Sequence, residues 1–276
     1  MIFASDLDQT LIYSKRFVTG ENHRVRLIET KDEEEISYMT EKAIDSLKAI
    51  SQKILFIPTT TRTVAQYQRI SLFHNEIVPS YAVVSNGGNI MVKGQLDKGW
   101  NEKIHSRIKN ECLESHDVLG GFEEIRSEAW VKSLRTADGL FHYCIIEKEH
   151  IPKRELEDFS KWLRVNNWHM SLQGRKLYFV PRCVSKWEAI AHIQEREGKE
   201  TVIAAGDSLL DMPMLDMANY ALVPTHGEIM KTYGKTAEEV STYTFIDKEG
   251  IAAAEEILEK VSEILKHSSQ IQKRVI

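Results

Sequence analysis

The sequence is poor in cysteine. Only Cys112, Cys144 and Cys183 occur among 276 residues, and no two of them form a CxxC pair. A disulfide framework or a zinc site needs more cysteines at closer spacing, so both are excluded and a reducing compartment is favoured. The ten histidines include no HExxH pattern, and none is assigned to a metal.

The sequence also lacks an excess of positive charge and a long apolar run. Its formal net charge is −5, which argues against nucleic-acid binding as the main task. No apolar stretch approaches the length that spans a bilayer. The N-terminus has no basic segment, and Asp6 and Asp8 fall where the apolar core of a signal peptide would lie. We therefore expect a soluble cytoplasmic protein without nucleic-acid or membrane partners.

What the sequence does have is an alternation of short apolar runs with amphipathic stretches, which predicts a parallel sheet flanked by helices. The apolar runs are hydrophobic almost throughout, as in strands buried on both faces. They span residues 2–5, 54–58, 81–85, 201–205 and 220–223. Helical spacing predicts helices over residues 40–51, capped by Thr40, over residues 186–196, with Ser185 as candidate cap, and over residues 250–265. The polar residues from about His267 onward are expected to fray.

Two segments depart from this alternation. Residues 24–40 form a predicted β-hairpin, which is either a partner-binding element or a second lid over a site. Residues 89–182 mix two helices (100–113 and 152–165) with four strands in hairpin-like succession (129–136, 140–147, 169–172 and 175–180). The expected fold class is therefore α/β. It has a Rossmann-like parallel-sheet core of residues 1–88 and 183–276, and an inserted α+β domain of residues 89–182.

Asp6 and Asp8 follow the first predicted strand, at its C-terminal end. In an extended chain, residues i and i+2 point the same way, so the two carboxylates can share one site. Like charges at that distance are unfavourable unless a cation joins them or one carboxylate stays protonated. Taken alone, the pair is also compatible with two solvated loop aspartates.

Three further polar segments lie at or just beyond predicted core elements, near the sheet edge where ligands bind in open parallel folds. The segment Thr59-Thr60-Thr61-Arg62 can hold phosphate oxygens, or it forms an ordinary turn. Lys186 stands in the first turn of a predicted helix, where either an anionic partner or solvent surrounds it. Asp207 and Asp211, in GDSLLD, can flank one hard cation, although an N-cap aspartate also fits.

In chain order these pieces read DLDQT, IPTTTR, VSKWEA and GDSLLD, and they resemble the four motifs of the haloacid dehalogenase superfamily of phosphotransferases. The resemblance covers nearly the whole chain, and the insert lies where this superfamily carries its type-two cap domain. Entered through Ser85-Asn86-Gly87-Gly88, that insert is similar to the IIB subgroup. The subgroup includes Cof-type sugar phosphatases, sucrose-phosphate phosphatases, mannosyl-3-phosphoglycerate phosphatases and phosphomannomutases. The sequence departs from the common motifs at Gln9, Thr61 and Leu210.

The resemblance implies a phosphoryl-transfer site with Mg²⁺ as cofactor. It makes Asp6 the nucleophile, Asp8 the general acid and base, and Lys186 the third catalytic residue. The expected metal site is formed by Asp6, Asp207 and the backbone carbonyl of Asp8, with Asp211 orienting metal-bound water. The expected phosphate-binding residues are Thr60, Thr61 and Lys186. The expected substrate contacts are Arg62, Asn86, Arg135 and Arg175, and further candidates in the cap are Lys132, His142, Lys176 and Tyr178.

An acid two residues after the nucleophile accompanies phosphate-ester chemistry in this superfamily. We therefore expect a Mg²⁺-dependent phosphatase that acts on a small phosphorylated metabolite, in particular a sugar phosphate, through an aspartyl-phosphate intermediate. The alternatives are a phosphomutase resembling phosphomannomutase and a non-catalytic sensor of a phosphorylated ligand on the same fold. The expected assembly is a monomer or a homodimer.

Overall fold

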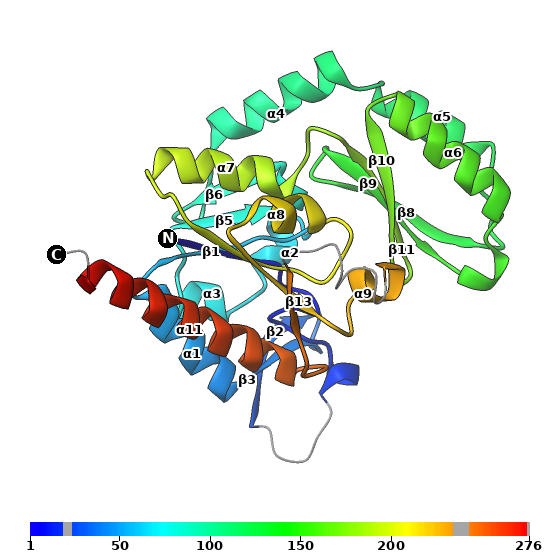
Figure 1. Ribbon diagram of the computed structural model, residues 1–276. Coiled ribbons are helices and arrows are strands. Elements are labelled where there is room, and N and C mark those ends of the chain that lie inside the picture. Colours follow the sequence, from blue (N-terminus) through cyan, green and yellow to red (C-terminus); the bar gives the residue numbers. More distant parts are fainter. Residues whose placement is uncertain (19–23, 234–242, 275–276) are drawn as a thin grey trace.

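The computed structural model describes residues 1–18, 24–233 and 243–274, and a five-stranded parallel sheet lies at its centre (Figure 1). Every residue of two neighbouring inner strands, β1 (Ile2–Ser5) and β12 (Val202–Ala205), is buried, as their continuous hydrophobicity predicted. In spatial order the strands are β14 (Tyr243–Ile246), β13 (Tyr220–Pro224), β12 (Val202–Ala205), β1 (Ile2–Ser5) and β4 (Leu55–Pro58). The α/β fold class expected from the sequence is confirmed.

Helices cover both faces of this sheet, because successive residues of a strand point to opposite sides. On one side, Phe3 packs with α1 (Glu41–Ser51) and α11 (Ala252–Arg274), which lie side by side in Figure 1. On the other side, Ile2 packs with α7 (Lys186–Arg196) and α8 (Met212–Met217). The three predicted helices are present, but α11 continues to Arg274 where the sequence predicted fraying.

Of the two predicted helix caps, one is confirmed and one is wrong. Thr40 Oγ1 accepts a hydrogen bond of 3.1 Å from the Ala43 amide at the start of α1. Ser185 makes no such bond at the start of α7. Instead its carbonyl faces Gly87, whose φ is +92° and where a Cβ atom would lie 2.1 Å from that oxygen. Only glycine permits this close approach, which sets the turn η2 (Ser85–Gly87) against the first residue of α7.

The sequence placed residues 81–85 in the parallel sheet, and the structure supports this only in part. A single parallel bridge joins Val83 to Thr59 just beyond β4, but the regular pairing of this segment is with other strands. β5 (Tyr81–Val84) forms an antiparallel sheet with β6 (Asn89–Val92) and β7 (Gln95–Leu96). The fifth strand of the central sheet is β14, at the opposite edge. The apolar pattern missed β14 because this short strand is only partly buried.

A second α+β unit lies at the upper right of Figure 1, beyond the long helix α4 (Lys98–Glu111). Its four strands are antiparallel in the order β10 (Trp168–Gln173), β11 (Lys176–Pro181), β9 (Phe141–Ile146) and β8 (Val131–Ala137). α6 (Lys153–Val165) and α5 (Ser115–Glu123) pack on the sheet through a cluster that includes Phe122, Phe159 and Phe179. The sequence predicted all of these elements except α5, whose adjacent glycines weaken the helical signal.

The predicted hairpin is present as β2 (Val25–Lys31) and β3 (Glu34–Thr40). Asp32 and Glu33 form its two-residue turn with positive φ angles of 51° and 67°, which match the twist of the strands. The remaining short elements are η1 (Lys15–Phe17), α2 (Val64–Tyr67), α3 (Leu72–Asn75), η3 (Lys148–His150) and α9 (Glu228–Tyr233). Within the described residues, no helix is long and apolar enough to cross a membrane.

Candidate active site

Three of the predicted acidic residues meet at the C-terminal edge of the central sheet. Asp6 directly follows β1, Asp207 lies just beyond β12, and Asp211 ends the loop that leads into α8. Carboxylate oxygens of these three residues all lie within 4.8 Å of one another, and all three side chains are buried. Because parallel strands end at the same edge, residues about 200 positions apart in the sequence form one cluster.

Lys186 completes this cluster as its cation. Its Nζ donates a hydrogen bond of 2.6 Å to Asp6 and one of 2.5 Å to Asp211, and only 1% of the residue is exposed. Burial by itself lowers the pKa of a lysine, but the two carboxylates outweigh it and the pKa of Lys186 is raised. The sequence left open whether an anionic partner or solvent surrounds Lys186. In the described structure, the carboxylates of Asp6 and Asp211 bind its ammonium.

The cluster holds more negative than positive charge. Burial, together with the neighbouring Asp211 and Asp8, raises the pKa of Asp6 to about 7 even though Lys186 opposes the shift. The pKa of Asp207 is raised well above its usual range, mainly by burial and then by Asp6. A buried set of carboxylates with one lysine fits a hard divalent cation, which binds oxygen ligands and would lower both pKa values.

The loop between Asp207 and Asp211 is shaped around the Asp211 side chain. Asp211 Oδ2 accepts hydrogen bonds from the Ser208 hydroxyl (2.8 Å) and amide (2.9 Å). A Cβ atom at Gly206 would lie 2.5 Å from the Asp211 Cβ, so glycine is required there for the carboxylate to enter the loop. Leu210, which departs from the superfamily pattern, is buried in the apolar cluster on the α7 side of the sheet.

Asp8 does not join the three clustered carboxylates. Both of its oxygens are bound by one guanidinium, because Arg62 Nε and Nη2 donate hydrogen bonds of 2.7 and 2.8 Å. Half of the Asp8 side chain is exposed. Its partial desolvation would raise its pKa, but Arg62, with weaker help from Lys176 and Lys186, lowers that pKa to about 2. In this arrangement Asp8 is a carboxylate in a bidentate ion pair.

Sequence reasoning missed the residues that hold Arg62. Its Nη1 donates a hydrogen bond of 2.8 Å to Glu29 in the β2–β3 hairpin, and the Glu29 side chain is fully buried. Arg69 and Ser37 also donate to Glu29, over 3.0 and 2.7 Å. One signal was available, because Glu29 is an acidic residue next to the apolar pair Leu27-Ile28 of a predicted strand.

The threonine segment lies beside the acidic cluster, at the end of β4. Thr60 is fully buried, and its Oγ1 accepts a hydrogen bond of 3.1 Å from the Arg62 amide. Thr61 is half-buried and hydrogen-bonded to the Tyr178 phenol of β11. Asn86 is also buried, and its amide donates 3.0 Å to the Val184 carbonyl, two residues before Lys186.

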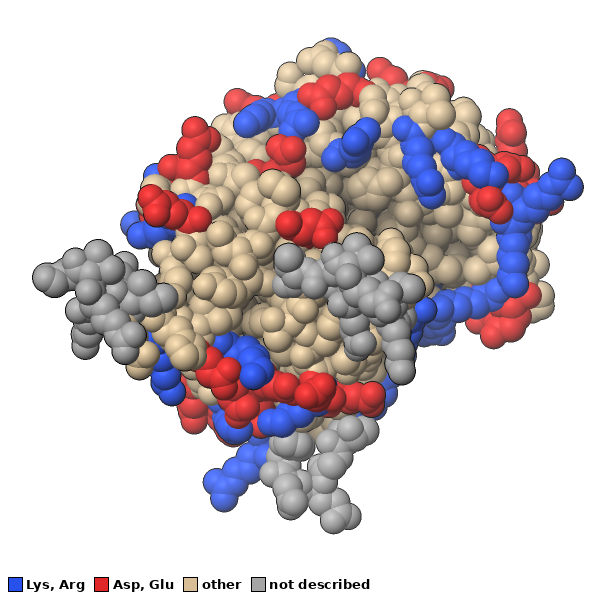
Figure 2. Space-filling model, viewed as in Figure 1, with Lys and Arg blue, Asp and Glu red and all other residues tan. Residues whose placement is uncertain are grey.

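The four-stranded sheet reaches the site through β11. Tyr178, which is 4% exposed, contacts Thr61, and Lys176 lies on the same face of the strand. Tyr178 and Asp8 both raise the pKa of Lys176, which places its ammonium near them. Figure 2 shows a hollow in the surface beside this sheet, with lysine and arginine side chains around it.

The other candidate cap residues lie elsewhere. Arg135 lies on the same face of the four-stranded sheet as Tyr178, but two strands away, on the edge strand β8. Arg175 is exposed in the β10–β11 turn. Within the described residues, no hydrogen bond or ion pair joins either arginine to the acidic cluster. His142 is buried between Ser115 and Thr136, and Lys132 is exposed.

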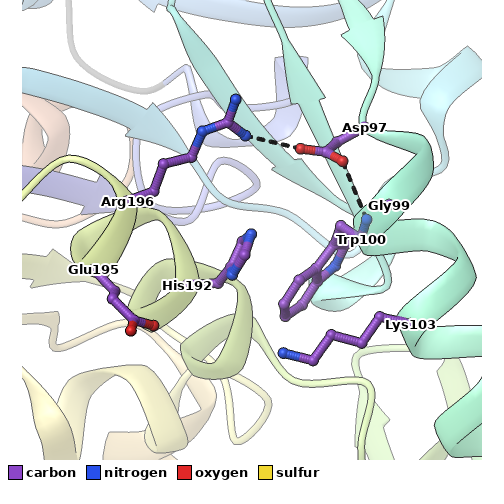
Figure 3. A pocket seen from close by; sticks show the side chains of 7 residues that line it. All are labelled: Asp97, Gly99, Trp100, Lys103, His192, Glu195 and Arg196. Carbon is purple, nitrogen blue, oxygen red and sulfur yellow. Dashed lines mark hydrogen bonds and ion pairs between the residues drawn. The ribbon is translucent and has the colours of Figure 1, made fainter.

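A separate pocket of about 400 Å³ lies between α4 and α7 (Figure 3). Its walls include Trp100, whose ring is tilted by 30° against that of His192 with 4.8 Å between centroids, and an ion pair of 3.0 Å between Asp97 and Arg196. None of the predicted site residues lines it. The indole of Trp100 donates to the Gly87 carbonyl, so this pocket borders the turn that supports Lys186.

A family model described as sucrose-6F-phosphate phosphohydrolase matches residues 1–262 of the chain. No curated protein sequence matches the chain significantly. Among solved structures, the fold is similar to a sucrose-phosphatase from Synechocystis in complex with sucrose and phosphate. That structure has a TM-score of 0.68 and 12% identity, with 95% of this chain and 97% of that chain covered.

Two further solved structures share the fold at low identity. One is a IIB sugar phosphatase of the haloacid dehalogenase superfamily, with a TM-score of 0.53, 12% identity, and 97% and 98% coverage of the two chains. The other is a haloacid dehalogenase-like hydrolase from Bacillus subtilis, with a TM-score of 0.52, 14% identity, and 94% and 90% coverage. Because the family model spans nearly the whole sequence, the chain belongs to the sucrose-6F-phosphate phosphohydrolase family and is a phosphatase of the haloacid dehalogenase superfamily.

Proposed function

We propose that this protein is a Mg²⁺-dependent phosphomonoesterase that removes phosphate from a phosphorylated sugar. The observation that carries the proposal is the buried cluster of Asp6, Asp207 and Asp211, whose carboxylate oxygens lie within 4.8 Å of one another beside Lys186. Family membership supplies the reaction class, and sucrose 6F-phosphate is the first substrate to test.

The proposed reaction has two steps on Asp6. In the first, an Asp6 oxygen attacks phosphorus, the bond to the sugar oxygen breaks, and Asp8 protonates the departing oxygen. In the second, water attacks the aspartyl-phosphate, its proton passes to Asp8, and phosphate leaves. Lys186 and Thr60 bind phosphate oxygens and offset the charge that develops on them. A divalent cation held by Asp6, Asp207 and Asp211 would reduce the repulsion between the Asp6 carboxylate and the substrate phosphate.

The Arg62–Asp8 ion pair places a condition on this reaction. Both Asp8 oxygens are occupied by the guanidinium and the carboxylate is charged. Arg62 must therefore turn away, and Asp8 must take up a proton, before Asp8 can protonate a leaving oxygen. Arg62 is then free to bind the substrate phosphate, for which a bidentate guanidinium is well suited. Arg62 binds Asp8 in the described structure, and the predicted contact between Arg62 and substrate forms once the guanidinium leaves that carboxylate.

We further propose that residues 89–182 are the cap domain and residues 1–88 and 183–276 the catalytic core. Lys176 and Tyr178 are cap side chains that act on core residues of the site, since Asp8 raises the pKa of Lys176 and Tyr178 contacts Thr61. These two residues, ahead of Arg135 and Arg175, are proposed to contact the sugar. Water is excluded when the cap covers the phosphate.

Phosphate release from a panel of sugar phosphates, nucleotides and phosphoglycerate derivatives tests the proposal. With Mg²⁺, the protein should release phosphate from a sugar phosphate without forming an isomer, and Asp6→Asn should abolish the release. Asp45→Asn is the matched control, because Asp45 is an exposed carboxylate on α1. Isomer formation without net release would favour a phosphomutase, and no activity on any ester would favour a sensor.

A further inference from the structure

Two of the three cysteines lie together where the chain passes between the core and the four-stranded sheet. Cys112 follows α4, on the way into that unit, and Cys183 follows β11, on the way out. Their sulfur atoms are 4.0 Å apart although 71 residues separate them. A disulfide requires the sulfurs to approach by a further ~2 Å.

The two thiols differ in exposure and in surroundings. Cys112 is partly exposed, whereas Cys183 is 3% exposed. The neighbouring Cys183 thiol is the main cause that lowers the pKa of Cys112 to about 7, while the Cys112 thiol also donates to the Asn167 carbonyl over 3.4 Å. The pKa of Cys183 is raised, first because its thiol donates to Cys112 and then by burial. Cys112 therefore has the features of an attacking thiolate, and Cys183 those of a second thiol held ready beside it.

We propose that Cys112 and Cys183 form an oxidisable dithiol, which a hydroperoxide converts into an intramolecular disulfide. In the first step the Cys112 sulfur attacks a peroxide oxygen, the O–O bond breaks, and Cys112 becomes a sulfenic acid while hydroxide leaves. In the second step the Cys183 sulfur attacks the Cys112 sulfur, the S–O bond breaks, and the proton of Cys183 leaves with the hydroxide as water. Two electrons pass from the thiols to the peroxide.

The bond would join the entry and exit segments of the four-stranded unit. Hydrogen bonds already hold both segments to Asn167, whose carbonyl accepts from the Arg182 amide over 2.8 Å and whose side chain donates to the Glu111 carbonyl over 2.6 Å. Cys183 also precedes Lys186 by only three residues. The disulfide is thus expected to restrain movement of this unit against the core and to lower turnover, an effect that rests on the proposed function.

The third cysteine is an internal control. Cys144 is fully buried in β9, and burial raises its pKa to about 12. The purified protein would be treated with hydrogen peroxide, and the remaining thiols alkylated and mapped by peptide mass spectrometry. We expect the alkylated cysteines to fall from three to one, with Cys144 left and Cys112 joined to Cys183. Dithiothreitol should restore all three.

Two variants separate the steps. In Cys183→Ser, oxidation should stop at a sulfenic acid on Cys112 that dimedone traps, whereas in Cys112→Ser the remaining thiols should resist peroxide. Both variants should remain folded under the conditions of the assay. Equal oxidation of Cys144, a disulfide between two chains, or no loss of thiols would overturn the proposal.

Turnover is read separately from the thiol mapping. Peroxide should lower phosphate release by the unmodified protein, reversibly with dithiothreitol, and should leave Cys183→Ser less affected. A fully formed disulfide with unchanged turnover would overturn the inferred restraint. Because the mapping needs no substrate, a failure of the dithiol proposal is distinguishable from a failure of the proposed phosphatase activity.

Discussion

Asp6→Asn is expected to make the metal-free protein more stable while it removes activity. Asp6 is 5% exposed, lies beside two other buried carboxylates and shares Lys186 with one of them. Its pKa rises from 3.8 to about 7 in the folded chain. The shift corresponds to about 4 kcal/mol of free energy between the protonated and charged forms, so replacing the charge with a neutral amide relieves part of that amount.

The sign of the pH dependence follows from the same shift. The folded state holds the Asp6 proton more tightly than the unfolded state, so this contribution to stability is fully present below about pH 4. It is lost as the pH rises through about 7. The raised pKa of Asp207 acts in the same direction. Asp6→Asn should therefore be more stable than the unmodified protein at pH 8 by up to about 4 kcal/mol, and the difference should shrink toward pH 4.

Urea unfolding at pH 4, 6 and 8 with a chelator measures this difference, with Asp45→Asn as the control for the substitution itself. Added Mg²⁺ should stabilise the unmodified protein at pH 8 and have a smaller effect on Asp6→Asn, because a ligand of the native state has been removed. A lower stability of Asp6→Asn than of the unmodified protein at pH 8 without metal would refute the inference that burial and neighbouring carboxylates make the charged form of Asp6 unfavourable.

Three other substitutions test further parts of the site. Lys186→Met should lower kcat/KM by about 10²–10³-fold, because a charged donor to the phosphate is lost. Glu29→Gln should destabilise the protein by about 2–3 kcal/mol and loosen Arg62, since a buried carboxylate that accepts from three side chains loses its charge. Lys176→Met should raise KM about tenfold with a smaller change in kcat, if its ammonium binds the substrate outside the reacting phosphate.

Exposed residues of the same types serve as controls for these variants. Lys53→Met and Glu102→Gln change residues on the surface, and neither should alter kinetics or the free energy of unfolding. Normal kcat/KM in Lys186→Met would contradict the assigned phosphate contact. Unchanged stability in Glu29→Gln would show that the hairpin does not brace Arg62, and an unchanged KM in Lys176→Met would place the sugar elsewhere.

The clustered part of the site was predictable because each residue belongs to a short motif after a predicted core element. Asp6, Asp207 and Asp211 could be placed at one sheet edge from parallel topology, whereas Lys186, in the first turn of a helix, could be placed there only through its motif. The ion pair between Asp8 and Arg62 was not predictable, because it depends on Glu29 in a hairpin whose packing the sequence does not reveal. The sequence suggested only that the hairpin is a lid or a partner-binding element.

The errors in the fold prediction have a similar origin. The run at residues 81–85 is as apolar as a core strand, but an apolar pattern does not predict which strand a segment pairs with. In the structure β5 pairs antiparallel with β6. In the cap, which strand faces the site depends on how the whole unit is oriented. Lys176 and Tyr178 could therefore not be ranked above Arg135 and Arg175 from the residues alone.

The central claim is that the Asp6 carboxylate becomes phosphorylated during turnover. The direct measurement is to quench the reaction with a sugar phosphate and Mg²⁺, reduce acyl phosphates with borohydride, and map the peptides by mass spectrometry. Asp6 should be converted to homoserine only when both substrate and metal are present, with Asp8, Asp207 and Asp211 unchanged. Turnover without modification of Asp6, or turnover that persists in Asp6→Asn, would contradict it.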